Sequence, residues 1–423
     1  MTSLLRLATA GSVDDGKSTL VGRLLFDSKS VLADQFDAVE RVSRDRGLET
    51  ADLALLTDGL RSEREQGITI DVAYRYFATP RRTFILADCP GHVQYTRNTV
   101  TGASTADVVV VLVDVRKGLL EQTRRHLAVA SLLRVPHVVV VVNKIDLVAF
   151  DEATYEAVAA QVLDAAGRLG LADVTTIPVS ALDGDNIVER SARTPWYDGP
   201  SVLEHLETLS PRVDHDAEPL RFPVQFVIRP QTAADARFRD YRGYAGQIAS
   251  GTVRVGDAVT VLPSGRTTTI AAIDLAGEEL AAAFAPLSVT LRLADEIDIA
   301  RGDFLVASDA VPALTQDLDG TVAWLADRDL IVGAKVLLKH GTRTVQALVK
   351  AIGGSLDLDA AALREASTLA LNDIGHVTLR LASPIPAERY VDSRTTGSFL
   401  LIDPHDGTTL AAGMVGDALL ESV

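Results

Sequence analysis

The chain has 423 residues, 47% of them hydrophobic and 23% charged, which is enough for two to four globular domains and excludes a disordered protein. Its single cysteine excludes a disulfide framework and any zinc site built from several thiolates. A net charge of −16 argues against nonspecific nucleic-acid binding, and apolar runs far shorter than roughly 18 residues exclude a membrane-spanning helix. We therefore expect a soluble, cytoplasmic protein with neither a membrane nor a nucleic acid as partner.

The first half of the chain alternates strand-like and helix-like segments. Nearly continuous runs of branched apolar residues, typical of strands buried on both faces of a parallel sheet, occur at 4–10, 82–88, 107–115, 137–143 and 174–180. Helical patterns lie between them, as in 121–135 and 152–170. This alternation predicts a doubly wound, mainly parallel α/β domain over residues 1–212.

The stretch "GSVDDGKS" between the first strand and the first helix fits the pattern G-x-x-x-x-G-K-[ST] of a P-loop. Its glycines let backbone N–H groups turn toward phosphates, and the helix N-terminus adds the positive end of its dipole. Lys17 would reach the β- and γ-phosphates, and the Ser18 hydroxyl would bind Mg²⁺. The candidate nucleotide-binding residues of this loop are Gly11, Ser12, Val13, Asp14, Asp15, Gly16, Lys17, Ser18 and Thr19.

The next candidate lies in "EREQGITID" (Glu63–Asp71), directly before the strand-like "VAYRYF". A mobile loop here would bring Thr69 to Mg²⁺ when a γ-phosphate is present. The alternative is an ordinary β-branched residue at the start of a strand.

The motif "DCPGH" follows the strand-like "RTFILA". Asp88 would hold Mg²⁺ through water, and the Gly91 N–H would bond the γ-phosphate, so loss of that phosphate would release the loop. His92 is then the candidate catalytic residue that orients the attacking water, the alternative being a solvated loop histidine. Cys89 and Pro90 occupy the variable positions of the motif, and we expect Cys89 to be neither a nucleophile nor a metal ligand.

Two further motifs would recognise the base. In "NKID", Asp146 can accept two N–H bonds from one edge of guanine, and adenine would leave this carboxylate unpaired. Sites of this kind reject the wrong partner by roughly 10⁴-fold. "SAL" follows the next strand and would supply a backbone N–H to the base oxygen. The candidate residues of both motifs are Asn143, Lys144, Asp146, Ser180, Ala181 and Leu182.

From about residue 216 the pattern changes to short strands separated by glycine-rich turns, as in a β-barrel. We predict one β-barrel domain over residues 216–310 and a second over 311–423. The second contains one expected helical interruption, near "DAAALREAS" (359–367).

The ordered motifs are typical of a GTPase, and their exact amino-acid sequences indicate a closer resemblance. "DCPGHVQYTRN" with "REQGITID" resembles the translational GTPases of the elongation factor Tu and 1-alpha type. "GSVDDGKSTLVGRLL", "HVQYTRNTVTGAS" and "RFRDYRGYAGQIASGTVRVGD" are similar to one branch of them, the GTPase (large) subunit of bacterial sulfate adenylyltransferase, or ATP sulfurylase.

This resemblance implies two β-barrels after the GTPase domain, GTP and Mg²⁺ as cofactors, and a hetero-oligomer with a smaller adenylyltransferase subunit of the PP-loop type. In that family the partner joins ATP and sulfate into adenosine 5′-phosphosulfate, and GTP hydrolysis drives this uphill step of sulfate assimilation. The sequence agrees in what it lacks, because it holds no second P-loop, no S-G-G-x-D loop and no H-x-G-H.

The alternative is a translation factor that binds aminoacyl-tRNA under the control of GTP. It predicts GTP-dependent tRNA binding that weakens steeply with salt. A third possibility, a regulatory GTPase with another target, predicts hydrolysis that sulfate and ATP do not stimulate.

Overall fold

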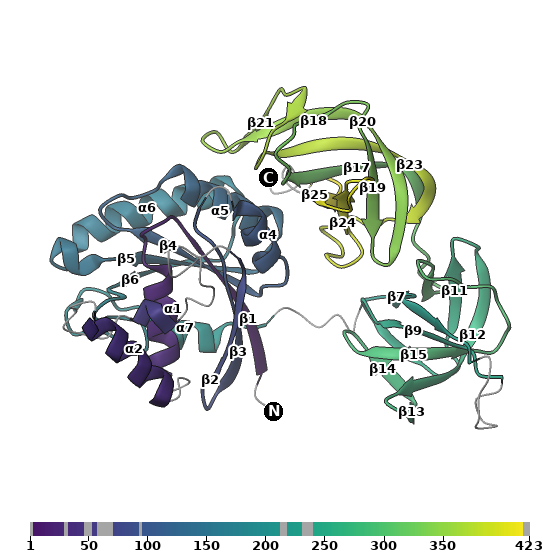
Figure 1. The fold of residues 1–423 in the computed structure, drawn as a ribbon, viewed down its shortest axis with the longest axis horizontal. Helices are drawn as coiled ribbons and strands as arrows, with labels where there is room; N and C mark the ends of the chain where they lie inside the picture. Colours follow the sequence, from purple (N-terminus) through teal and green to yellow (C-terminus); the bar gives the residue numbers. More distant parts are fainter. Residues whose placement is uncertain are drawn as a thin grey trace. The chain divides into compact units, whose positions relative to one another are not determined.

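The computed structural model describes residues 3–28, 33–45, 53–56, 71–92, 95–211, 218–230 and 240–417. The chain forms two compact units that divide near residue 212. The first unit is built around one α/β sheet, and the second is built from β-sheets (Figure 1).

The sheet of the first unit has six strands in the order β2-β3-β1-β4-β5-β6. Only β2 is antiparallel to its neighbour, so the sheet is mainly parallel, as predicted. Its strands are β1 (Ser3–Gly11), β2 (Ala73–Ala78), β3 (Arg82–Asp88), β4 (Val108–Asp114), β5 (His137–Asn143) and β6 (Val174–Val179). The helical elements are α1 (Lys17–Asp27), α2 (Ala33–Asp45), η1 (Leu53–Leu56), α4 (Thr96–Ser104), α5 (Glu121–Leu132), η3 (Ile145–Val148), α6 (Glu152–Arg168) and α7 (Val202–Thr208).

The helices cover both faces of this sheet, which explains why its central strands are apolar throughout. All seven residues of β4 are buried. On one face, Leu20 and Leu24 of α1 and Leu206 of α7 pack against Leu5 and Leu7 of β1 in one core. Figure 1 shows α4, α5 and α6 on the opposite face. Parallel strands joined by helices end at the same edge, so the loops that follow β1, β3, β5 and β6 meet there.

The second unit contains an eight-stranded antiparallel sheet of β7 (Arg221–Pro223), β8 (Phe226–Ile228), β9 (Gly243–Gln247), β11 (Ala258–Leu262), β12 (Arg266–Leu275), β13 (Glu278–Leu280), β15 (Ser288–Leu293) and β16 (Phe304–Ala307). Beside it, β10 (Thr252–Arg254) pairs with β14 (Ala282–Phe284). Residues 268–272 of β12 alternate buried and exposed, and one face of the sheet encloses a core that includes Phe222, Tyr244 and Leu291.

The C-terminal sheet of this unit closes into a barrel, because β19 pairs with β20 at the two ends of the run β19-β24-β25-β17-β23-β20. Its elements are β17 (Leu314–Trp324), β19 (Lys335–His340), β20 (Arg343–Asp357), β21 (Ala362–Arg364), β23 (Ile374–Pro386), β24 (Ser398–Ile402) and β25 (Thr409–Val415), with β18 (Leu330–Ile331) paired to β22 (Thr368–Leu369). The domain limits 1–212, 216–310 and 311–423 stay predictions.

The helical interruption expected near residues 359–367 is wrong. The segment is a turn followed by β21, which lies at the edge of the sheet next to β20. The Asp357 carboxylate accepts the N–H groups of Asp359 and Ala360, both at 2.9 Å, and Ala361 has a positive φ of 50°. A segment this short gains little as a helix in water, and strand pairing satisfies its backbone instead.

An ion pair between a buried arginine and a partly buried glutamate joins the two sheets of the second unit. The Arg221 guanidinium on β7 contacts both carboxylate oxygens of Glu388, which follows β23, at 2.9 and 2.8 Å. Thr396 Oγ1 donates to the same carboxylate at 2.7 Å. Burial works against the charged form of Glu388, but these hydrogen bonds outweigh it and lower the pKa of the carboxyl. The pair therefore holds a fixed geometry between the two sheets.

Replacing Arg221 alone should destabilise this unit. Arg221→Met leaves a partly buried carboxylate unpaired, and we expect it to lower the free energy of unfolding by about 3 kcal/mol. The measurement is urea unfolding followed by the fluorescence of Trp324, which is buried in the C-terminal barrel, in a Trp196→Phe background that removes the other tryptophan.

The matched control is Arg380→Met, which removes an exposed partner of Asp317. Exposed pairs contribute about 0–1 kcal/mol, so this variant should unfold nearly as the parent does. Equal unfolding midpoints for the two variants would contradict the role given to Arg221.

Candidate functional site

The P-loop connects the end of β1 at Gly11 to the start of α1 at Lys17. Gly16 caps α1 with a φ of 95°, a left-handed conformation that residues with a Cβ rarely adopt. The Lys17 ammonium donates to the carbonyl oxygens of Gly11 at 2.9 Å and Ser12 at 3.1 Å, and burial lowers its pKa. The loop thus places a buried amine beside a helix N-terminus, an arrangement suited to phosphate.

Asp15 shapes this loop from within. It is 1% exposed, its Oδ2 accepts the Ser12 N–H at 2.8 Å, and burial raises its pKa. Two buried oxygens, Ser12 Oγ and Asp15 Oδ1, have no hydrogen-bond partner among the residues that the structure describes. Buried polar atoms are rarely left unpaired in folded proteins, so these oxygens fit a loop that completes its hydrogen bonds with a ligand.

The DCPG motif lies directly against the P-loop. Asp88 ends β3 level with Thr9 of β1, whose Oγ1 donates to Asp88 Oδ1 at 2.9 Å. A Cβ on Gly91 would fall 2.2 Å from Lys17 Nζ and 2.5 Å from the Gly11 carbonyl oxygen, which leaves room only for glycine. The backbone of this loop is therefore within reach of a phosphate that Lys17 contacts.

Cys89 is fully buried in this loop. A Cβ on Gly102 of α4 would fall 2.4 Å from Cys89 Sγ, so the helix packs closely over the sulfur. Burial raises the pKa of the thiol, which keeps it protonated and unreactive. This environment supports the prediction that Cys89 is neither a nucleophile nor a metal ligand.

The base-recognition motifs are tied to the P-loop through Asn143. Its Nδ2 donates to the Asp15 carbonyl at 2.7 Å, and its Oδ1 accepts the Ala181 N–H at 2.9 Å. Lys144 Nζ donates to the Asp14 carbonyl. One asparagine therefore fixes the P-loop, "NKID" and "SAL" relative to one another.

The structure brings the described residues of these motifs to one edge of the sheet. Asp146 lies in η3, half-buried, and Leu182 exposes 66% of its surface beside the buried Ser180. His92 follows Gly91, with its ring 6.0 Å from that of Tyr95. Thr69 lies outside the described residues. The individual roles of all these residues stay predictions.

The oxygen donors of the site fit Mg²⁺. The Ser18 hydroxyl and the Asp88 carboxylate are hard ligands of the kind that Mg²⁺ prefers. Within the described ranges, no group of three or more His, Cys, Asp or Glu residues could hold a metal ion by itself. A Mg²⁺ ion here would complete its shell with phosphate oxygens and water, as is usual at nucleotide sites.

Two polar residues of this region did not enter the sequence prediction. Asp114 ends β4 next to Asn143, and His126 of α5 is 1% exposed near the Gly11 carbonyl and Lys17. Burial lowers the pKa of His126 to about 3, so the imidazole is neutral. Asp114 could have been found by the rule used for Asp88, because both are carboxylates at the carboxyl end of a strand. Nothing in the sequence distinguishes His126 from a solvated helical histidine.

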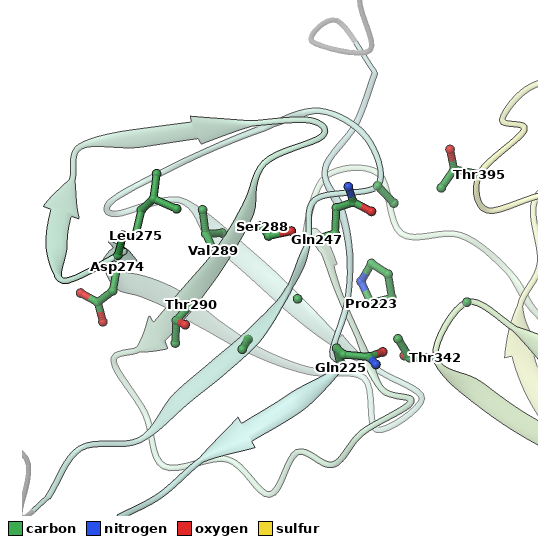
Figure 2. Close-up of a pocket in the computed structure, with 15 residues that line it drawn as sticks. Pro223, Gln225, Gln247, Asp274, Leu275, Ser288, Val289, Thr290, Thr342 and Thr395 are labelled. Atoms are coloured by element: carbon green, nitrogen blue, oxygen red, sulfur yellow. The ribbon is translucent and has the colours of Figure 1, made fainter. Parts of the chain in front are cut away.

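A separate hollow of about 580 Å³ lies in the second unit (Figure 2). Its polar lining consists of amides and hydroxyls, such as Gln247, Ser288 and Thr290, and one carboxylate, Asp274. The hydroxyl of Tyr241 already donates to that carboxylate at 2.7 Å. Among the residues that the structure describes, the lining includes no lysine or arginine. This lining differs from that of the P-loop, where a buried lysine lies beside a helix N-terminus.

Comparison with protein families identifies two parts of the chain. The elongation factor Tu GTP binding domain matches residues 2–217, and the GTP-eEF1A C-terminal domain-like family matches residues 317–416. The solved Ski7 GTPase-like domain of S. cerevisiae, bound to GDP and inorganic phosphate, has the same fold, with a TM-score of 0.55 and 18% identity over 98% of this chain and 97% of that one. These findings confirm the predicted fold of a P-loop GTPase domain followed by β-barrels.

Among curated proteins, the chain is 47% identical to a sulfate adenylyltransferase subunit 1 from Bacteroides fragilis, over 98% of this chain and 86% of that protein. The corresponding protein of Methylorubrum populi is 49% identical over 97% and 87%. A bifunctional enzyme CysN/CysC from Mycobacterium tuberculosis is 54% identical over 98% of this chain and 67% of its own length. None of the described helices has the length and apolar character that crossing a membrane requires.

Adding one methyl group at Gly91 should disrupt the phosphate side of the site. In Gly91→Ala the new Cβ displaces either Lys17 or the Gly11 carbonyl, so we expect GTP affinity to fall at least about tenfold, or 1.4 kcal/mol. A titration with a fluorescent GTP analogue measures this. The control is Gly167→Ala on α6, where a Cβ meets nothing within 4 Å and affinity should stay unchanged. Wild-type affinity in Gly91→Ala would show that this close approach is not needed.

The buried neutral His126 should make the first unit sensitive to acid. Its folded pKa of about 3 lies below the ordinary value of 6.5, so the unfolded chain takes up a proton first and stability falls as pH drops from about 6.5 toward 3. His126→Asn should flatten this part of the stability profile. The measurement is urea unfolding at several pH values, followed by Trp196 fluorescence in a Trp324→Phe background. Parallel profiles for parent and variant would contradict the assignment.

Proposed function

The chain belongs to the family of sulfate adenylyltransferase subunit 1, GTPase subunits that carry an elongation factor Tu GTP binding domain, and from this premise we propose what its GTP hydrolysis does. Hydrolysis drives the synthesis of adenosine 5′-phosphosulfate from ATP and sulfate in a second, smaller subunit of the PP-loop adenylyltransferase type. The observation that carries the proposal is the ordered set of GTPase motifs at one sheet edge, in a chain that aligns with subunit 1 proteins over nearly its whole length.

On the phosphate side, binding depends on the buried amine and the inward-facing backbone of the P-loop. Lys17 neutralises charge that builds on the transferred phosphoryl group, together with the loop N–H groups. Ser18 and Asp88 would hold Mg²⁺, the latter through water, and Thr69 would join them when the γ-phosphate is present. When bound, the ion neutralises charge on the β- and γ-phosphates. Gly91 lies close to the Lys17 amine, and its backbone N–H bonds the γ-phosphate.

On the base side, selectivity for guanine comes from a carboxylate on a rigid support. Asp146 accepts two N–H bonds from the base, and the backbone of Ser180–Leu182 faces the base oxygen. Asn143 holds both groups in register with the P-loop through its hydrogen bonds to Asp15 and Ala181. A mispositioned Asp146 would weaken binding and relax the discrimination against adenine.

His92 orients the attacking water. It follows Gly91 directly, so a γ-phosphate that contacts Gly91 also brings His92 near the line of attack. A water molecule held in line gains most of its rate from positioning, since phosphoryl transfer needs little covalent chemistry from the protein. The free energy of GTP hydrolysis drives the reaction in the partner subunit, and neither a membrane nor a nucleic acid takes part.

The test is GTP hydrolysis by the chain purified with its partner subunit, with and without ATP plus sulfate. We expect ATP and sulfate together to stimulate hydrolysis, and His92→Ala to reduce the stimulated rate by at least about 100-fold, the typical contribution of one positioned catalytic group. GTP affinity should stay within about twofold, because His92 acts on the water rather than on ground-state binding.

The matched control is His405→Ala, an exposed histidine of the second unit, which should hydrolyse GTP like the parent. Hydrolysis that ignores sulfate would overturn the coupling and favour a translational or regulatory GTPase. Full stimulated turnover in His92→Ala would remove His92 from the mechanism while leaving the coupling intact.

A further inference from the structure

Asp114 is a buried carboxylate beside the nucleotide site that none of the GTPase motifs includes. It ends β4, pairs in register with Asn143 at the end of β5, and its side chain is fully shielded from solvent. An isolated charge at such a position would be costly, so its partners explain why it is there.

Two cations hold this carboxylate. Arg116 forms a fork, with Nε at 3.0 Å from Oδ1 and Nη2 at 2.6 Å from Oδ2, and its backbone N–H also reaches Oδ1 at 3.0 Å. Lys144 Nζ lies 3.1 Å from Oδ2. Burial works against the charged form of Asp114, but the hydrogen bonds from Arg116 and Lys144 outweigh it and hold the pKa well below its usual range. Arg116 and Lys144 therefore stabilise the charged form of this carboxylate.

The lysine end of this network reaches the P-loop. Lys144 Nζ also donates to the carbonyl of Asp14, so one ammonium connects Asp114 to the loop that faces the nucleotide. Both Lys144 and Asp14 have left-handed backbones, with φ of 66° and 67°. Such conformations cost of order 1–3 kcal/mol for residues with a Cβ and persist only where the surroundings fix them.

Of the charged groups around Asp114, Lys144 is the one that connects this carboxylate to the base-recognition motif. The Arg116 side chain is about half exposed and lies within the electrostatic range of Asp146. Asp15, Lys17 and Lys117 are further charged groups of this region. Only Lys144 is both bonded to Asp114 and part of "NKID", two residues before Asp146.

We propose that Asp114 is a positioning residue for nucleotide binding, which acts through Lys144 to hold "NKID" and the Asp14 carbonyl in register. This inference rests on the proposed base-binding role of "NKID". It implies that guanine-nucleotide affinity depends on Asp114, whereas the hydrolytic step at saturating GTP does not, because Lys17, Asp88 and His92 are fixed by other contacts. It further implies that Asp114 has little effect once Lys144 has lost its ammonium.

The experiment is a double-mutant cycle on the full-length chain with Asp114→Asn and Lys144→Met. The dissociation constant of a fluorescent GDP analogue is measured for the parent, both single variants and the double variant, without sulfate or ATP. We expect each single variant to bind about tenfold more weakly, or 1.4 kcal/mol. The double variant should bind within about twofold of Lys144→Met, because two residues that act as one unit are not additive.

The kinetic readout separates positioning from a merely structural role. For Asp114→Asn, KM for GTP should rise in step with the dissociation constant, while kcat stays within about twofold of the parent. The matched control is Asp107→Asn, a buried carboxylate directly before the opposite end of β4 that accepts the Arg6 N–H at 2.8 Å. Its affinity for GDP should equal that of the parent.

Three outcomes would overturn the proposal: parent-like affinity in Asp114→Asn, effects of the two single variants that multiply in the double variant, or an equal loss in Asp107→Asn. If Asp114→Asn fails to fold, Asp114→Glu decides, since it keeps the charge but displaces the oxygens by one methylene. Weaker GDP binding with an intact fold supports the proposal, and parent-like binding overturns it. Because no sulfate is present, a failure of the coupling proposal leaves this test unaffected.

Discussion

Parallel pairing of β1 with β3 and β4, and of β4 with β5, is the constraint on which the nucleotide site depends. It places Thr9 opposite Asp88 and Asp114 opposite Asn143, so the strands end level and every loop that follows them opens on the same edge. Short hydrogen bonds between loops can form only because the strand ends are level. The buried, valine-rich strands pack the core of the sheet. Their register also brings the polar groups at the strand ends within hydrogen-bond distance of one another.

Much of this arrangement could be predicted from the sequence, because P-loop, "DCPG" and "NKID" are contiguous in the chain and have strong local patterns. Strand positions followed equally well from the apolar runs. His126 could not be predicted because its role comes from neighbours distant in the sequence, which no local pattern encodes. Asp114, by contrast, ends a strand as Asp88 does and could have been found by the same rule. The segment 359–367 was assigned to a helix for a related reason: its alanines favour a helix locally, whereas pairing beside β20 decides its conformation.

The two units are stabilised by different kinds of interaction. The first unit brings charged side chains close together, and each needs a partner of opposite charge or a hydrogen bond. Holding these groups in place requires left-handed backbone conformations at Asp14 and Lys144. The second is held by apolar cores and by the Arg221–Glu388 pair, which gives its two sheets a defined relation without strained backbone in the pair itself.

The shielding of Cys89 also matters outside the catalytic cycle. A thiol that stays protonated beneath α4 is a poor target for peroxides and electrophiles, so the GTP site is insulated from the redox state of its surroundings. Because the chain has no other cysteine, a single cysteine engineered on the surface would be the one thiol open to maleimide reagents. A single spin label or dye could then be attached at a chosen surface position without first removing a residue from the nucleotide site.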